Sequence, residues 1–280
     1  MSDIIKADGT VEHFEPAKLM DSLLKAGAGP HVAERITRMV TATLGPGARS
    51  TEVYRRAFSM LRREARHVAA RYSLRRALLE FGPTGFPFED FISHLLRKEG
   101  YTVETRRIIE GKCVPHEVDV YASRKDECIA AELKYHNDPS YKTDVKVALY
   151  VKARYDDLMA VPKGDRTCTV DRLFLITNTK FTSHAVEYAT CTGIHLLGWS
   201  YPKEGNLYDR MTQAGVYPVT TLTTLRRAEK RFLVESGAVA SDMLRERRDL
   251  LTAQRISSER VGEIIAEADA LAAMSFSHGT

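Results

Sequence analysis

The sequence predicts an α/β protein in which a small helical region, a mixed sheet and a group of C-terminal helices follow one another. The segment 114–122 alternates apolar and polar residues with the period of two that is typical of strands, and the neighbouring apolar segment 128–136 places Glu132 and Lys134 two residues apart. The stretches before and after them repeat apolar residues at helical spacing, and glycine and proline separate the repeats. The expected regions are 1–82, 83–205 and 206–280.

The first region is expected to be mostly helical, with a β-hairpin over residues 4–16 that turns tightly at Asp8-Gly9. Four amphipathic helices follow, and the glycine-rich breaks at 27–30 and 45–47 separate the first three. The expected bounds of the helices are 16–27, 30–44, 51–63 and 66–81.

This arrangement resembles the ATP-cone, the regulatory nucleotide-binding module of many ribonucleotide reductases. The resemblance implies that ATP or dATP binds here, with Lys6 and Lys18 at the phosphates and Thr51 and Arg55 beside the same pocket. Ala7 departs from the family pattern, which commonly has a second basic residue there, so the phosphate affinity and the choice between ATP and dATP stay open. The matching segments are Ile5-Lys6, Asp8-Gly9, Phe14, Lys18-Leu19, 50–53 and 70–78.

A bound nucleotide is expected to act as an effector and not as a fuel. The phosphate-cradling pattern G-x-x-x-x-G-K-[ST] does not occur in the sequence, and Gly82-Pro83-Thr84-Gly85 lacks the lysine and hydroxyl that such a loop needs. An effector favours one conformation through its differential affinity.

The second region is expected to order its elements as α-β-β-β-α-β-α-β. Apolar residues at helical spacing begin it, and two extended segments joined by a polar turn lie near its centre. The expected elements are a helix at 86–100, strands at 101–109, 114–122 and 128–136, a helix at 141–160, a strand at 172–178, a helix at 182–190 and a strand at 193–199.

Two acids and a lysine mark the central pair of strands. Asp119 lies on the first strand, and Glu132 and Lys134 lie two residues apart on the second, so they share one face. The same acid-x-Lys pattern recurs at 110–112, in an expected turn, and at 144–146, in an expected helix. Only 132–134 lies on an apolar strand that follows an acid-bearing strand. Two carboxylates beside a lysine can hold a divalent cation and a water molecule, which is the chemistry of phosphodiester cleavage.

Residues 83–200 resemble the PD-(D/E)xK nuclease fold, and more narrowly the Mrr-like restriction endonucleases. The segments 85–89 and 177–189 are similar to two short motifs of that family. The resemblance implies a DNA endonuclease with Asp119, Glu132, Lys134 and Glu89 as catalytic residues. Asp119 and Glu132 would bind Mg²⁺ or Mn²⁺. The alternative, that Glu89 is an ordinary solvated helix residue, stays open.

The C-terminal region is expected to form short helices over 219–251, broken at Ser236-Gly237, and an amphipathic helix over 258–274. The first of these stretches is similar to helix-hairpin-helix modules, which bind DNA phosphates. An ordinary charged helix surface is the alternative, because glutamates lie among the basic residues. The candidate phosphate-facing residues are Arg226, Arg227, Lys230 and Arg231.

Composition excludes little. The net charge of +4 and the isoelectric point near 8.8 permit nucleic-acid binding without requiring it. No apolar run is long enough for a membrane helix and no signal-peptide pattern begins the chain, so a soluble cytoplasmic protein is expected. Four cysteines without C-x-x-C spacing are expected to be free thiols. They are Cys113, Cys128, Cys168 and Cys191.

Two functions besides a nuclease stay open. The first is a nucleotide-responsive DNA-binding regulator in which the nuclease fold is inactive. The second is an assembly protein that forms a homo-oligomer, in which the bound nucleotide sets the oligomeric state and the C-terminal helices supply the interface.

Overall fold

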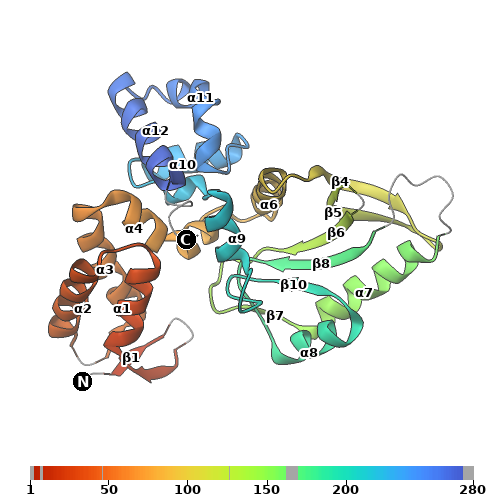
Figure 1. Cartoon of the computed structure of the whole chain (residues 1–280), viewed down its shortest axis with the longest axis horizontal. Coiled ribbons are helices and arrows are strands. Elements are labelled where there is room, and N and C mark those ends of the chain that lie inside the picture. The colour runs from red at the N-terminus through yellow and green to blue at the C-terminus, as the bar shows by residue number, and fades with distance from the viewer. Residues whose placement is uncertain (1–2, 7–8, 46, 126, 162–169, 274–280) are drawn as a thin grey trace.

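The protein is a mixed α/β molecule, as the sequence predicts, and Figure 1 shows its N-terminal helices, its main sheet and its C-terminal helices side by side. The computed structural model describes residues 3–6, 9–45, 47–125, 127–161 and 170–273. None of the helices in these ranges is long and apolar enough to cross a membrane.

The N-terminal hairpin is confirmed, and a third short strand joins it. β1 and β2 pair antiparallel, and β3 pairs parallel to β1. Gly9 has a φ of +82°, which favours glycine, while Asp8 of the predicted turn lies outside the described residues. The strands are β1 (Asp3–Ile5), β2 (Val11–His13) and β3 (Ala48–Arg49).

Three of the four N-terminal helices are confirmed, but the fourth is two helices separated at Ser73. The Ser73 hydroxyl donates to the Ala70 carbonyl at 2.8 Å, a local bond that competes with the helical pattern. The helices enclose a core of their own that includes Leu23, Ile36 and Leu61, all fully buried. Their bounds are α1 (Pro16–Lys25), α2 (Pro30–Thr43), α3 (Ser50–Glu64), α4 (Arg66–Tyr72) and α5 (Leu74–Leu79).

The main sheet has five strands in the order β10-β8-β6-β5-β4. In this sheet β4, β5 and β6 pair antiparallel, and β6, β8 and β10 pair parallel. The predicted order of helices and strands is therefore confirmed. A separate pair, β7 (Lys142–Thr143) and β9 (Lys180–Phe181), was not predicted. The main strands are β4 (Thr102–Glu110), β5 (Pro115–Arg124), β6 (Glu127–Lys134), β8 (Arg172–Thr177) and β10 (His195–Leu197).

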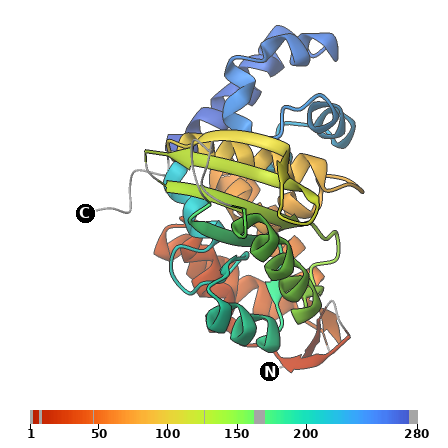
Figure 2. The ribbon, with the colours of Figure 1, turned by 90° about the vertical axis from the view of Figure 1, so that its right-hand side faces the viewer.

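Helices cover both faces of this sheet. Phe88 and Phe91 of α6 pack with Val120 of β5 in one core cluster, and Val151 of α7 packs with Leu175 of β8 in another. Figure 2 shows α7 and α8 together on one side of the strands. The bounds are α6 (Phe86–Lys98), α7 (Val145–Met159) and α8 (Ser183–Thr192).

The C-terminal helices form a compact group whose last helix is buried along the predicted apolar face. Glu267 of this helix, α12, accepts hydrogen bonds from the backbone N–H and hydroxyl groups of Thr223 and Thr224 at 2.7–2.9 Å. The break at Ser236-Gly237 is confirmed, because α10 ends just before it. The elements are α9 (Leu207–Ala214), η1 (Val219–Thr221), α10 (Arg227–Glu235), η2 (Ser241–Arg245), α11 (Arg248–Ala253) and α12 (Ser258–Ala273).

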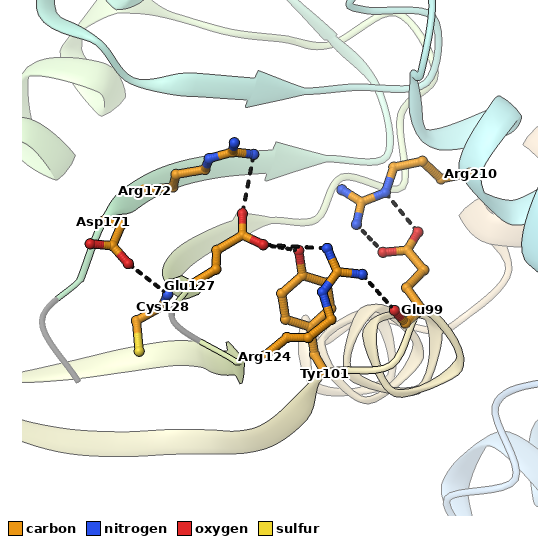
Figure 3. Close-up of polar contacts among 8 residues, drawn as sticks. All are labelled: Glu99, Tyr101, Arg124, Glu127, Cys128, Asp171, Arg172 and Arg210. Carbon is orange, nitrogen blue, oxygen red and sulfur yellow. Dashed lines mark hydrogen bonds and ion pairs between the residues drawn. The ribbon is translucent and has the colours of Figure 1, made fainter. Parts of the chain in front are cut away.

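A polar network joins α9 to the end of α6 and to the sheet (Figure 3). Arg210 of α9 holds the Glu99 carboxylate, and its Nε lies 2.8 Å from Oε1. Arg124 donates to the Glu99 carbonyl at 2.9 Å and also contacts Glu127. Tyr101 donates to the same Glu127 carboxylate at 2.8 Å. These bonds fix the first C-terminal helix against the α6 end of the sheet.

The hydrophobic cores do not follow the three expected regions. Leu74 and Leu78 of α5 pack in the same cluster as α6, the sheet and α12, while residues 4–69 supply the separate N-terminal core. The expected boundary at residue 82 therefore lies within a shared core, and α5 connects the N-terminal helices to the sheet.

The expectation of four free cysteines is wrong for Cys128, which is buried and disulfide-bonded. Cys113 and Cys191 are free and exposed, and Cys168 lies outside the described residues.

Candidate active site

Asp119 lies where the two central strands separate. The β5–β6 pairing ends at Val120 opposite Ala131. Beyond that pair, the Leu133 N–H donates to Asp119 Oδ2 at 2.7 Å, so a side-chain carboxylate takes the place of a strand carbonyl. The sequence predicts an acid at this position, and the structure shows that the hydrogen bond from the Leu133 N–H holds its carboxylate in place.

Glu132 and Lys134 share one face of β6, as predicted. Lys134 Nζ lies 2.7 Å from Glu132 Oε1. The second carboxylate oxygen of Glu132 is held by Arg154 of α7. Glu132 is 8% exposed, and a carboxylate so deeply buried is stable only when cations or hydrogen-bond donors surround it. Arg154 was not predicted, because the sequence does not reveal which residue of α7 reaches the sheet.

Three of the predicted catalytic side chains, Glu132, Glu89 and Lys134, act electrostatically on the fourth, Asp119. Burial, and next the charge of Glu132, raises the pKa of Asp119 to about 6. The charge of Glu89 acts in the same direction, whereas Lys134 lowers this pKa. Two mutually repelling carboxylates in a partly dry site form a centre that favours a cation or a proton.

Glu89 lies in the first turn of α6 and faces the sheet. Its side chain is 14% exposed, so the alternative that it is a solvated helix residue is wrong. Arg106 of β4 binds its carboxylate at 2.9 Å and reaches Asp90 at 3.3 Å. Burial nevertheless raises the pKa of Glu89.

Arg106 has an unusual backbone conformation. Its φ is +52°, in the left-handed region that side chains other than glycine rarely adopt. The register pairs Thr105 with Val120 and Arg107 with Val118, which places Arg106 opposite Asp119. Strained backbone of this kind is typical of functional sites. Arg106 carries no sequence signal, since nothing in a strand pattern marks a residue with positive φ.

The donors at this site are compatible with a hard divalent cation. Asp119 and Glu132 supply carboxylate oxygens, which Mg²⁺ and Mn²⁺ prefer. Among the described residues, no group of three or more His, Cys, Asp or Glu side chains is placed to hold a metal ion. A cation here would therefore rest on two carboxylates and complete its shell with backbone, water or phosphate oxygens.

The predicted nucleotide-binding residues are only partly brought together. Lys6 pairs with Glu12, and Lys18 lies 3.1 Å from Glu12. These lysines lower the pKa of Glu12. No hydrogen bond or ion pair joins Thr51 or Arg55 to either lysine in the part of the chain that the structure describes. A phosphate would have to replace Glu12 at both lysines.

The four C-terminal basic residues do not form one surface. Lys230 turns inward and donates to the Thr220 carbonyl. Arg231 lies 3.9 Å from Glu235 of its own helix. Arg226 and Arg227 are exposed. The prediction that these four residues form a single phosphate-facing patch is therefore wrong.

Comparison with known proteins identifies relatives. Residues 217–272 match the family described as "AF1548-like, C-terminal". An uncharacterized protein of Archaeoglobus fulgidus is 36% identical over 181 residues, which cover 63% of this chain and 97% of that protein. The chain belongs to the AF1548-like family. The crystal structure of AF1548, a protein of unknown function, is similar with a TM-score of 0.54 and 31% identity, and the match covers 68% of this chain and 99% of that chain. This member of the AF1548-like family is therefore longer than both relatives, and about a third of it lies outside each match.

Proposed function

We propose that this protein is a metal-dependent DNA endonuclease that ATP or dATP regulates allosterically. The observation that carries the proposal is the convergence of Asp119, Glu132 and Lys134 where β5 and β6 separate, with Glu89 in electrostatic reach. The finer architecture belongs to the same proposal. Residues 1–82 would be an ATP-cone and 83–205 a restriction-endonuclease-like αβββαβ unit.

Asp119 and Glu132 would hold Mg²⁺ or Mn²⁺ between them. Burial, and next the charge of Glu132, raises the pKa of Asp119, which supports this assignment because a bound cation would stabilise both carboxylates in their charged form. When bound, the cation would lower the pKa of a coordinated water and offset charge on the phosphate.

The surrounding cations would complete the site. Lys134, 2.7 Å from Glu132, is placed to orient or deprotonate the attacking water, or to offset charge on the phosphate as the bond breaks. Arg154 holds the other side of Glu132, and Arg106 holds Glu89. Both arginines therefore position acids that would act on the cation or its water.

The N-terminal helices contact the end of the catalytic strand, which supports regulation. The Tyr135 hydroxyl, next to Lys134 in the chain, donates to the Leu79 carbonyl of α5 at 2.9 Å. Arg75 of α5 donates to the Pro139 carbonyl at 2.9 Å. A nucleotide that shifts these helices would bias the active site through α5, and by linkage DNA would bias nucleotide affinity.

Cleavage of supercoiled plasmid DNA in Mg²⁺, with and without ATP or dATP, tests the proposal. Lys134→Ala should abolish nicking, whereas Lys146→Ala, in the acid-x-Lys triplet at the start of α7, should cut like the parent. Asp119→Asn controls for contaminating nucleases. Equal cutting by Lys134→Ala and the parent would show that the site assignment is wrong.

A DNA-binding regulator is the second candidate function. The observation that favours it is that Lys134 and Arg154 occupy both carboxylate oxygens of Glu132, an arrangement that also suits an inactive fold. DNA binding without cleavage in any nucleotide state would support the regulator.

A further inference from the structure

A cavity of about 510 Å³ lies between the N-terminal helices and the C-terminal group. Helices α3 and α5 supply one wall, and η1 with the start of α10 supplies the other. Its volume is in the range of small-molecule sites. The C-terminal wall falls within the segment 217–272 that matches the AF1548-like family.

Positive charge dominates this cavity. Arg55, Arg62, Arg76 and Lys230 line it, and the acid among the lining residues is Glu80. Within the described ranges, none of the four basic side chains forms an ion pair with a carboxylate, although basic residues elsewhere, such as those around the active site, commonly do. With four cations and one acid in its lining, the cavity carries an excess of positive charge, which attracts an anion.

Two polar side chains of the cavity wall, those of Thr221 and Lys230, would gain from a bound ligand. Thr221 lines the cavity at 2% exposure, and its hydroxyl has no hydrogen-bond partner among the described residues. Unsatisfied buried hydroxyls are rare in proteins and call for an absent partner. Lys230 donates to the Thr220 carbonyl, and burial lowers its pKa. A bound anion would satisfy Thr221 and favour the charged form of Lys230.

We propose that this cavity binds a small molecule that carries two or more phosphate groups. Phosphate oxygens accept from guanidinium, ammonium and hydroxyl donors, which are the groups that converge here. Nucleic acid fits less well, because the unpartnered Thr221 hydroxyl is buried between two regions of the chain. Tyr54 lines the same cavity, and its ring centroid lies 4.7 Å from the guanidinium carbon of Arg76, a contact that helps to hold this cation in the cavity wall.

The site differs from the effector site that the sequence predicts around Lys6 and Lys18, and shares only Arg55 with it. It also stands independently of the nuclease proposal, because ligand binding and not DNA cleavage is measured. A nucleotide seated here would join α3 and α5 to the C-terminal helices.

Isothermal titration calorimetry on the full chain tests the site, with inorganic tripolyphosphate and ATP as separate probes. Arg62→Gln and Lys230→Gln should each weaken tripolyphosphate binding by about tenfold or more, since each removes a charge-assisted contact. Arg63→Gln removes the same charge from the exposed neighbouring position of α3 and should leave affinity unchanged. Tighter binding of ATP than of tripolyphosphate would identify a nucleotide, and equal binding a simple polyphosphate.

Thr221→Val is a second variant of the same site, chosen because it is expected to fold normally. It keeps the side-chain shape and loses no internal hydrogen bond, so the temperature of thermal unfolding should stay the same or rise while tripolyphosphate binding weakens. The proposal is overturned if the parent binds neither probe, if Arg62→Gln and Lys230→Gln bind like the parent, or if only duplex DNA binding responds to these variants.

Discussion

Replacing Asp119 by asparagine is expected to stabilise the metal-free protein at neutral and alkaline pH. The carboxylate is half-buried beside Glu132, and these surroundings favour its neutral form. Asparagine has nearly the same shape and carries no charge, and its side-chain oxygen can still accept the Leu133 N–H. The residue proposed to bind the cation would thus lower stability, as is common where function needs a strained or charged site.

The magnitude follows from the pKa. The rise from the ordinary 3.8 to about 6 corresponds to about 3 kcal/mol, at about 1.36 kcal/mol per pKa unit. Solvent screens a half-buried group, so we expect Asp119→Asn to gain about 1–2 kcal/mol in the free energy of unfolding.

The sign of the pH dependence is determined by the same shift. Below the ordinary value of 3.8, Asp119 is protonated in both the folded and the unfolded states, and the variant has no advantage. As pH rises from 3.8 to about 6, the unfolded chain releases the proton more readily than the folded protein, and the parent loses stability. The advantage of the variant therefore grows through this window and is complete above about pH 6.

Urea unfolding in EDTA at several pH values measures this difference. Asp21→Asn, at an exposed position of α1, is the control and should change stability little. The reasoning fails if Asp119→Asn is no more stable than the parent at pH 8, or if its advantage does not shrink toward pH 4.5.

Four further substitutions have expected effects on stability, measured by urea unfolding. Gly111→Ala should destabilise by about 1–3 kcal/mol, because its Cβ would lie 2.5 Å from a backbone carbonyl. Gly262→Ala meets nothing within 4 Å in a helix and should stabilise by about 0.5–1 kcal/mol, and the opposite order would contradict the packing. Glu267→Ala should lower the free energy of unfolding by about 3 kcal/mol, because it leaves four hydrogen-bond donors without their acceptor. Glu263→Ala, at an exposed position of the same helix, should change stability little. Leu175→Ala should cost about 2–5 kcal/mol, and a smaller loss would show that the core beneath α7 collapses around the gap.

The main sheet and the candidate acids could be predicted because their signals are local. Period-two alternation predicted the strand that forms β5, and the spacing of Glu132 and Lys134 placed them on one face of β6. The burial of Val120 on β5 agrees with this alternation.

Features that depend on tertiary contacts could not be predicted. Two-residue strands such as β3 and β7 carry too few residues to show a period. Ser73 ends a helix through its own hydroxyl, within an otherwise continuous helical pattern. Arg154 and Lys230 look like ordinary charged helix residues in the sequence, and only packing decides that one holds Glu132 and the other lines a cavity.

Mn²⁺ binding, followed by electron paramagnetic resonance of the free ion, tests the central claim most directly. The account predicts that the parent removes free Mn²⁺ at pH 7.5, that Mg²⁺ competes, and that Asp119→Asn loses this binding while Asp144→Asn keeps it. Equal Mn²⁺ binding by the parent and Asp119→Asn, or none by the parent with or without duplex DNA, would contradict a metal site formed by Asp119 and Glu132.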